Sequence, residues 1–343
     1  MQRFLILVAL FWSACAWSEL TLAQEPKVLV VHSYHQGFFW TDSIQRGIDQ
    51  QLDDREMDMR VLYLDSKRNQ SEQFFTQLES LYRTKLSDER FDAILVTDNN
   101  ALELMQHLAP LIKDTPVIFC GINNYRPSFH QSLNATGVIE NVDLEANLAL
   151  IERLHPDNKQ IYIISDHSVT GAILRDEIDD FIQQHDRYRN KITQLVPDNV
   201  EALKKKIAQL NKENVVLFWT YYRDKDGVVG SERDWIQINK ASNAPLFMVH
   251  DVGLGHGAVG GVIQSGYRQG VEAARLLEQV LDHPQEPLPP VVNGDSEIKL
   301  DYQAVVRWGL GASKNPRRSF LISRWNFRSV SPKKFACLAV CSC

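Results

Sequence analysis

The chain has 343 residues, of which 44% are hydrophobic, 23% are charged and 9% are aromatic. This composition supports ordinary packed cores and excludes a disordered chain, a collagen and a polytopic membrane protein. The net charge of −6 is uneven, because residues 302–343 contain eight Lys or Arg and no Asp or Glu, which leaves residues 1–301 at −14. An acidic body repels phosphate backbones, so we expect no nucleic-acid partner, and the length predicts two domains.

The N-terminal residues have the layout of a secretory signal peptide. Arg3 precedes an apolar run at 4–17, and a more polar stretch follows at 18–24. The run is shorter than the roughly 20 residues that a membrane-spanning helix needs. We therefore predict a signal peptide at 1–23 and export to the periplasm or another extracytoplasmic compartment, with an uncleaved membrane anchor as the alternative.

Residues 25–120 alternate between two hydrophobic patterns. Continuous apolar runs rich in β-branched residues predict buried strands, and segments with a 3.6-residue period predict helices between them. The predicted strands are 27–31, 60–64, 93–97 and 116–120, and the predicted helices are 41–52, 71–86 and 101–111. This rhythm is typical of a doubly wound α/β lobe with a parallel sheet.

The same rhythm begins again after a polar, turn-rich stretch at 121–134. Residues 137–142 lead into a helix that Asp143 caps and that ends near Leu154. The remaining predicted elements are strands at 160–164, 192–196, 215–219, 245–249, 262–263 and 298–300, and helices at 173–182, 200–210, 231–241, 267–281 and 302–308. They predict a second lobe with the architecture of the first.

Motifs spread along the chain resemble one family. They are VLVVHSYHQGFFW at 28–40, TDN at 97–99, FCGINN at 119–124, TGVIE at 136–140, ISDHSVTG from Ile164, GLGHGAVGG from Gly253 and YRQGVEAARLL from Tyr267. In this order they resemble the ABC-transporter substrate-binding proteins of the type I periplasmic-binding fold. The resemblance covers about residues 26–310 and is closest to the sensor regions of bacterial sensor kinases and diguanylate cyclases.

The resemblance implies two doubly wound parallel-sheet lobes, joined by a hinge, that close on a small ligand in the cleft between them. It implies that the chain crosses between the lobes three times and that the helix 267–281 returns to the first lobe. The expected division is 24–125 plus 256–285 for lobe 1, 136–252 plus 291–310 for lobe 2, and 311–343 as an irregular basic tail.

The sensor relatives continue into a membrane helix and signalling domains, whereas this chain ends in its basic tail. Two readings therefore stay open. The chain is either a free-standing binding protein that serves an ABC permease, or a truncated or frameshifted sensor module whose partner is a membrane signalling domain.

Ligands of open parallel sheets bind beyond the carboxyl ends of the strands, where loops and helix N-termini offer polar groups. In the first predicted lobe the candidates are Ser33, Tyr34, His35, Trp40, Thr97, Asp98, Asn99 and Asn123. In the second lobe they are Asp166, His167, Thr220, Tyr221 and Asp251. Helix capping or core packing would account for some of these residues equally well.

Two ligand classes remain open at these positions. An amino acid needs donors for its carboxylate, which Ser33, Thr97 and Thr220 offer. It also needs an acid for its amine, which Asp98, Asp166 or Asp251 offers. An aromatic ligand would instead stack on Tyr34 or Tyr221.

Other chemistries are weighed against this binding function. Ser33 between His32 and His35 suggests a hydrolase nucleophile, but the chain has no G-x-S-x-G elbow. The glycine-rich stretch 253–261 lacks the Lys-Ser/Thr pair of a phosphate-binding loop, and the histidines form no tight ligand cluster. We therefore expect a binding protein rather than an enzyme, with no cofactor and no metal.

Overall fold

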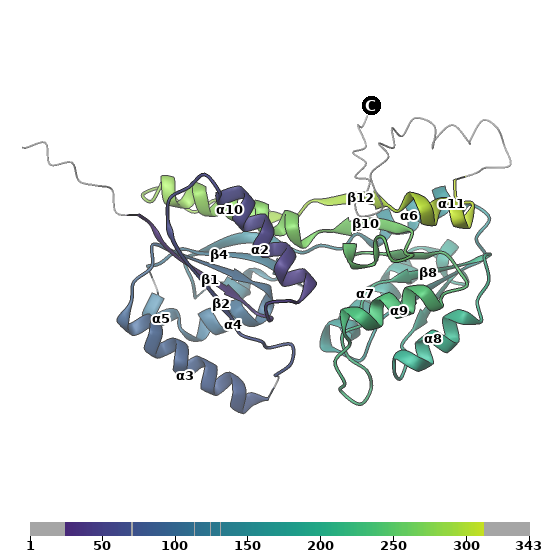
Figure 1. The fold of residues 1–343 in the computed structure, drawn as a ribbon, viewed down its shortest axis with the longest axis horizontal. Coiled ribbons are helices and arrows are strands. Elements are labelled where there is room, and N and C mark those ends of the chain that lie inside the picture. Colours follow the sequence, from purple (N-terminus) through teal and green to yellow (C-terminus); the bar gives the residue numbers. More distant parts are fainter. Residues whose placement is uncertain (1–24, 70, 113, 124, 131, 312–343) are drawn as a thin grey trace, which may run out of the picture.

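The protein forms two α/β lobes that lie side by side, as the computed structural model shows in Figure 1. The structure describes residues 25–311 except 70, 113, 124 and 131. The predicted signal peptide and all but the first residue of the predicted basic tail lie outside the described residues. Within the described part, no helix is both long and apolar enough to cross a lipid bilayer.

The first lobe is built on a six-stranded, all-parallel sheet in the order β11-β5-β4-β3-β1-β2. Its strands are β1 (Lys27–His32), β2 (Asp58–Tyr63), β3 (Ala93–Thr97), β4 (Val117–Ile122), β5 (Ala135–Ile139) and β11 (Val292–Asn293). Its helices are α2 (Phe39–Leu52), α3 (Glu72–Asp88), α4 (Asp98–His107), α5 (Ala109–Ile112) and α10 (Gly266–Asp282), with a 3₁₀ turn η1 (Pro127–His130).

Alternation along β1 explains why this sheet is covered on both faces. Val28 and Val30 pack into the core beneath α2 and α10, whereas Leu29 and Val31 pack into the core beneath α3, α4 and α5. Successive side chains of a strand point to opposite faces, so an uninterrupted apolar run requires helices on both sides.

The second lobe repeats this plan with a sheet in the order β12-β10-β9-β8-β6-β7. Its strands are β6 (Gln160–Ile164), β7 (Ile192–Leu195), β8 (Asn214–Phe218), β9 (Leu246–Met248), β10 (Gly260–Gln264) and β12 (Ser296–Leu300), which is antiparallel to β10. Its helices are α6 (Leu144–Leu154), α7 (Val169–Gln184), α8 (Val200–Ala208), α9 (Glu232–Ala241) and α11 (Tyr302–Trp308), with 3₁₀ turns η2 (Asp186–Tyr188) and η3 (Asp251–Gly253). The prediction of two doubly wound α/β lobes is confirmed.

The strand pairing divides the chain differently from the predicted boundaries at three strands. β11 was placed in lobe 2 but pairs with β5 in the first sheet. β5 was placed in lobe 2 by the sequence but pairs with β4 in the first sheet. β10 was placed in lobe 1 but pairs with β9 and β12 in the second. The sheet that a strand joins is decided by the strands it pairs with. The hydrophobic pattern of the strand itself does not show which strands these are.

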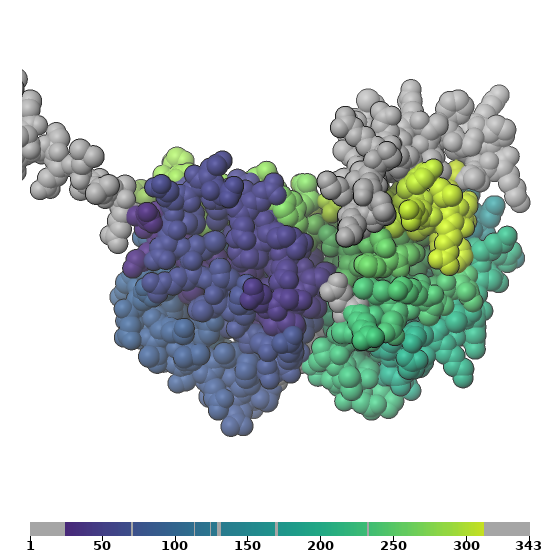
Figure 2. Space-filling view, viewed as in Figure 1, coloured from purple at the N-terminus to yellow at the C-terminus, as the bar shows by residue number. Residues whose placement is uncertain are grey.

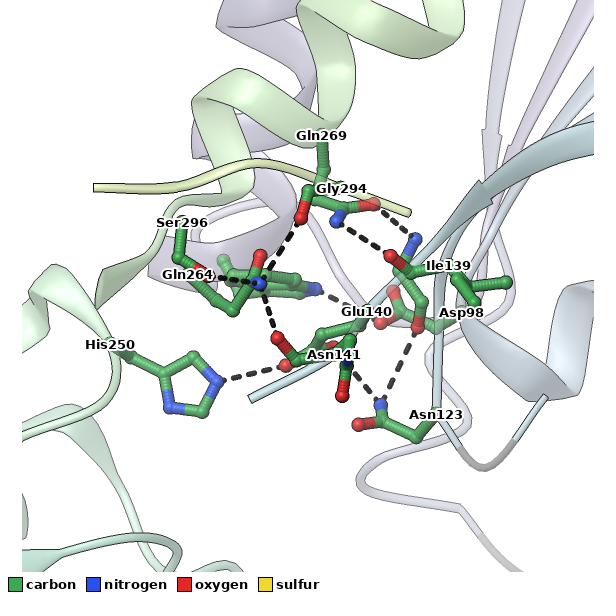
Figure 3. A network of polar contacts seen from close by, with 12 residues as sticks. Asp98, Asn123, Ile139, Glu140, Asn141, His250, Gln264, Gln269, Gly294 and Ser296 are labelled. Carbon is green, nitrogen blue, oxygen red and sulfur yellow. Dashed lines mark hydrogen bonds and ion pairs between the residues drawn. The ribbon is translucent and has the colours of Figure 1, made fainter. Parts of the chain in front are cut away.

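Three segments cross between the lobes: one after β5, one between β10 and α10, and one between β11 and β12. Two glutamines join them (Figure 3). Gln264 Nε2 donates to the carbonyl of Asn141 at 2.5 Å and to Ser296 Oγ at 3.0 Å. Gln269 Nε2 donates to the carbonyl of Ile139, the last residue of β5, at 3.3 Å. The hinge is therefore a hydrogen-bonded bundle of three strands rather than three independent linkers.

Helices α2 and α10 lie next to each other on the outer face of the first sheet (Figure 1). Glycines set their separation. A Cβ added to Gly270 would lie 2.1 Å from the Ile44 carbonyl oxygen, and one added to Gly47 would lie 2.1 Å from the Tyr267 carbonyl oxygen. Only glycine permits this approach of two helix backbones.

Candidate ligand-binding cleft

A cavity of about 1070 Å³ lies between the two lobes. Its walls come from the carboxyl ends of strands in both sheets, as is usual for ligand sites of open parallel sheets. From the first lobe it is lined by residues that include Tyr34, Trp40, Lys67, Asp98, Asn123, Tyr125 and Glu140. From the second lobe it is lined by residues that include His167, Ser168, Trp219, Thr220, Tyr222, Arg223 and His250.

Six of the residues predicted from the sequence line this cavity: Tyr34, Trp40, Asp98, Asn123, His167 and Thr220. They come from the two lobes and from five different strand ends. The Thr220 hydroxyl is buried and makes no hydrogen bond within the described structure. The expectation that ligands bind beyond the carboxyl ends of parallel strands therefore brings these six candidates together around one cavity, with polar and aromatic groups intermixed.

Four other candidates from the first lobe support the cleft from behind. The buried Ser33 hydroxyl donates to the Thr97 carbonyl at 2.6 Å and accepts from the Ala101 N–H at 2.8 Å. Asn99 exchanges hydrogen bonds of 3.1 Å with the backbone of Asn123. The remaining contacts are Thr97 Oγ1 with His32 Nδ1 at 3.0 Å and His35 Nδ1 with Asp65 at 3.3 Å. The Ser33 hydroxyl, the nucleophile of the hydrolase hypothesis, is therefore buried and hydrogen-bonded to the backbone on both sides.

Three candidates from the second lobe also serve the fold. Asp166 is fully buried and accepts hydrogen bonds from the backbone N–H groups of Ser168, Tyr222 and Arg223. Tyr221 is packed in the core beneath α8 and α9. Asp251 accepts from Ser265 Oγ at 3.2 Å and lies 3.7 Å from Lys299 Nζ. None of these three side chains is among the residues that line the cavity, so their contact with a ligand stays a prediction.

Asp98 is the most unusual group in the cavity wall. Its backbone is left-handed, with φ of 65°, and its side chain is only 2% exposed. Oδ1 accepts from Trp40 Nε1 at 2.9 Å, whereas Oδ2 is buried without any hydrogen-bond partner in the described structure. Burial and the nearby Glu140 carboxylate raise the pKa of Asp98 to about 7. Strain and an unpaired buried acceptor together mark a functional position.

Lys67 lies beside Asp98 in the same cavity wall and is 8% exposed. Its ammonium nitrogen lies 3.5 Å from the centre of the Tyr222 ring, 4.1 Å from that of Tyr34 and 4.6 Å from that of Phe38. Burial lowers the pKa of Lys67 to about 7, and the negative charges of Asp98, Glu140 and Asp166 limit the fall. The lysine is therefore held mainly by aromatic rings contributed by both lobes.

Glu140 and His250 join the two lobes at the floor of the cleft (Figure 3). Glu140 Oε1 lies 2.9 Å from His250 Nε2, and Glu140 Oε2 accepts from Asn123 Nδ2 at 3.0 Å. The Glu140 side chain is 5% exposed. Trp40 also crosses to His250, with ring centres 5.5 Å apart. These contacts hold the lobes together around the cavity, and Figure 2 shows the lobes abutting along their shared edge.

The ABC transporter substrate binding protein family model matches residues 40–308, which is most of the chain. The chain belongs to this family. The resemblance drawn from the motifs is confirmed at the level of the family and the type I periplasmic-binding fold. No curated protein sequence matches this substrate-binding protein.

Solved structures share the fold of this substrate-binding protein at low sequence identity. The ABC domain from Streptococcus pneumoniae in complex with L-Trp has 15% identity and a TM-score of 0.60, over 85% of this chain and 97% of that one. A ligand-free, open substrate-binding protein with adhesive properties from Clostridium difficile has 14% identity and a TM-score of 0.61, over the same shares. A carbohydrate transporter from Acidothermus cellulolyticus in complex with myo-inositol has 14% identity and a TM-score of 0.51, over 82% and 96%.

Sequence reasoning missed two groups of this substrate-binding protein's cavity wall as ligand candidates: Lys67 and Glu140. Both follow strands, after β2 and β5 respectively. Their positions after strands agree with the expected place of a ligand site. In a sequence, however, a lone lysine in a turn and a glutamate before a predicted helix look like solvent-exposed residues. Their burial depends on the opposite lobe.

The acidity of Asp98 predicts a pH-dependent stability for the substrate-binding protein. The pKa of Asp98 is raised from 3.8 to about 7 in the folded state, so folding retains a proton that the unfolded chain releases in that interval. This stabilisation is complete below about pH 4 and is lost as the pH rises to about 7. We expect the free energy of unfolding of the wild type to fall over this interval relative to that of Asp98→Asn. Urea unfolding of both proteins at the two ends of the interval measures this difference, and parallel curves would contradict it.

Lys67 contributes in the opposite interval. Its pKa is lowered from 10.5 to about 7, so the unfolded chain binds the additional proton between these values. The corresponding stabilisation is complete above about pH 10.5 and is lost as the pH falls towards 7.

Proposed function

We propose that the protein is an exported solute-binding protein that holds a small organic ligand, amino-acid-like or aromatic, between its lobes without altering it. The observation that carries this proposal is the unpaired, buried Asp98 Oδ2 in the wall of a cavity of about 1070 Å³ that both lobes complete. An unpaired buried acceptor costs stability, and a ligand that donates a hydrogen bond to it would recover that cost.

The surroundings of Asp98 fit such a ligand. Tyr34, Trp40 and Tyr222 offer ring faces or edges, and the Thr220 hydroxyl offers a second polar group without a partner. Mixed aromatic and polar walls suit a ligand with one charged end and one apolar body. That relatives of the same fold were solved with L-Trp and with myo-inositol supports a ligand of this size.

The delivery route is part of the same proposal. The apolar run at 4–17 favours export, and the family supports an ABC permease as the membrane partner. A membrane signalling domain is the alternative partner, by resemblance to sensor regions. The net charge of −14 over residues 1–301 speaks against a nucleic-acid partner.

Mass spectrometry of whatever small molecule co-purifies with the exported protein tests this function. We expect denaturation to release one dominant compound that rebinds stoichiometrically in calorimetry and is recovered unchanged. At a free concentration of 100 times its Kd, it should raise the free energy of unfolding by about 2.7 kcal/mol. Conversion of the compound to a product, or the absence of saturable rebinding, would contradict the proposal.

A further inference from the structure

The ammonium group of Lys67 occupies an aromatic cage. Tyr34 and Phe38 belong to the first lobe and Tyr222 to the second, and the three ring centres lie 3.5–4.6 Å from Nζ. Among the described residues, no carboxylate lies within ion-pairing distance, 4.0 Å, of Nζ. A buried lysine is normally paired with an acid, so the electron-rich ring faces take the place of the usual counter-ion.

An acid for a cation is nevertheless present in the same wall. Asp98 Oδ2 is buried without a partner, and the negative charges of Asp98, Glu140 and Asp166 all act on Lys67. The cavity wall thus contains two rings of the cage, Tyr34 and Tyr222, together with a carboxylate oxygen that has no partner, and these features recognise an ammonium group.

The charge of the whole cavity favours the same kind of guest. Its wall includes six carboxylates, from Glu72, Glu79, Asp98, Glu103, Glu140 and Glu177, against one lysine, one arginine and three histidines, which are Lys67, Arg223, His107, His167 and His250. A cleft lined mainly by one sign of charge concentrates ions of the other sign. An anionic ligand would enter against this field.

We propose that the cleft binds a small organic cation whose ammonium group lies in the cage of Tyr34, Phe38 and Tyr222. In the absence of ligand the ammonium group of Lys67 occupies this position, and the ligand displaces it. This inference rests on the proposed function and deepens it, because it names the charged end of the ligand. Lys67 lies in a turn after β2, so its side chain can withdraw without disturbing a strand.

Titration calorimetry on the full chain with probes that differ only in charge tests the inference. Phenethylamine and 3-phenylpropionate share a ring and chain length but carry an ammonium or a carboxylate. Choline has no ring and no N–H donor, so it tests the cage without the hydrogen bond to Asp98. We expect phenethylamine and choline to bind and 3-phenylpropionate not to bind. Tighter binding of the carboxylate would overturn the inference, as would no ammonium binding up to millimolar concentration in both the wild type and Lys67→Ala.

Substitutions at Lys67 distinguish a side chain that the ligand displaces from one that contacts the bound ligand. If Lys67 occupies the cage in about nine-tenths of the ligand-free molecules, only about one-tenth can bind a probe, so Lys67→Ala should raise the affinity for both ammonium probes by about tenfold. The exposed Lys85→Ala should leave it unchanged, and thermal unfolding confirms that each variant is folded. Weaker binding of ligand to Lys67→Ala would instead make Lys67 a partner for a ligand carboxylate and would overturn the inference.

Substitutions at Tyr222 test the cage itself. Tyr222→Phe keeps the ring and should bind the ammonium probes like the wild type, whereas Tyr222→Leu removes a desolvated cation–π contact and should weaken binding by about 30-fold. Equal affinities for the two variants would overturn the inference. A co-purifying ligand without a basic nitrogen would refute this inference and leave the proposed function standing, whereas the absence of any saturable ligand would refute the proposed function.

Discussion

Gly270→Val is expected to lower the free energy of unfolding by about 3 kcal/mol or more. The valine Cβ would lie 2.1 Å from the Ile44 carbonyl oxygen and 3.1 Å from the Ile48 backbone nitrogen. Both atoms belong to the backbone of α2, so no side-chain rotation relieves the clash, and the two helices must separate. Separation would expose the core between α2, α10 and the first sheet, which includes Ala273 and Leu277.

Urea unfolding of Gly270→Val beside Gln279→Val isolates this effect. Gln279 is exposed on the same helix, so Gln279→Val places a valine in α10 without the clash, at a cost of a few tenths of a kcal/mol in helix propensity. A loss below about 1 kcal/mol for Gly270→Val would mean that α2 and α10 are not held at the distance of the structure. Gly47 faces the same interface from the other helix, and its substitution by valine should have an effect of similar size.

The fold was largely predictable because its signals are local. Uninterrupted apolar runs such as that of β1, buried on both faces, already require a parallel sheet between helices. The Asp143 cap of α6 is a signal of the same kind, and the structure has its carboxylate accepting from the Ala146 N–H at 2.8 Å. Assignment of β5, β10 and β11 to sheets depends on which strands they pair with, and β5 and β11 lie more than 150 residues apart in the sequence, so no local pattern encodes it.

The site was predictable only in part, because neighbouring residues at a strand end serve different purposes. Ser33 ties β1 to β3 and α4, whereas the adjacent Tyr34 faces the cavity. Asp166 looked as suitable for a ligand amine as Asp98, but the loop that carries Tyr222 folds over it and supplies its hydrogen bonds. A sequence gives the residue types at these positions and not the direction of each side chain.

Asp98→Asn is expected to weaken binding of the ligand recovered from the wild type by about 10- to 100-fold, the usual range for a charge-assisted hydrogen bond. Asparagine has the same shape and its Oδ1 still accepts from Trp40 Nε1, so the cavity wall is preserved. What changes is the charge and the second oxygen, which in the wild type is a buried acceptor without a partner. Calorimetry of the recovered ligand with both proteins measures the loss.

Asp251→Asn provides the matched control. Asp251 also follows a strand, β9 of the second lobe, but it accepts a hydrogen bond from Ser265 and lies outside the cavity wall. Its affinity for the ligand should stay within about twofold of the wild type. Above pH 7, Asp98→Asn should be more stable than the wild type, because the ionised carboxylate is buried near Glu140 and asparagine tolerates the left-handed backbone. If Asp98→Asn binds the ligand more weakly but has a higher free energy of unfolding than the wild type, Asp98 has a ligand-binding role and not a structural one. Equal affinity would remove Asp98 from the site, and a less stable variant would make it part of the scaffold.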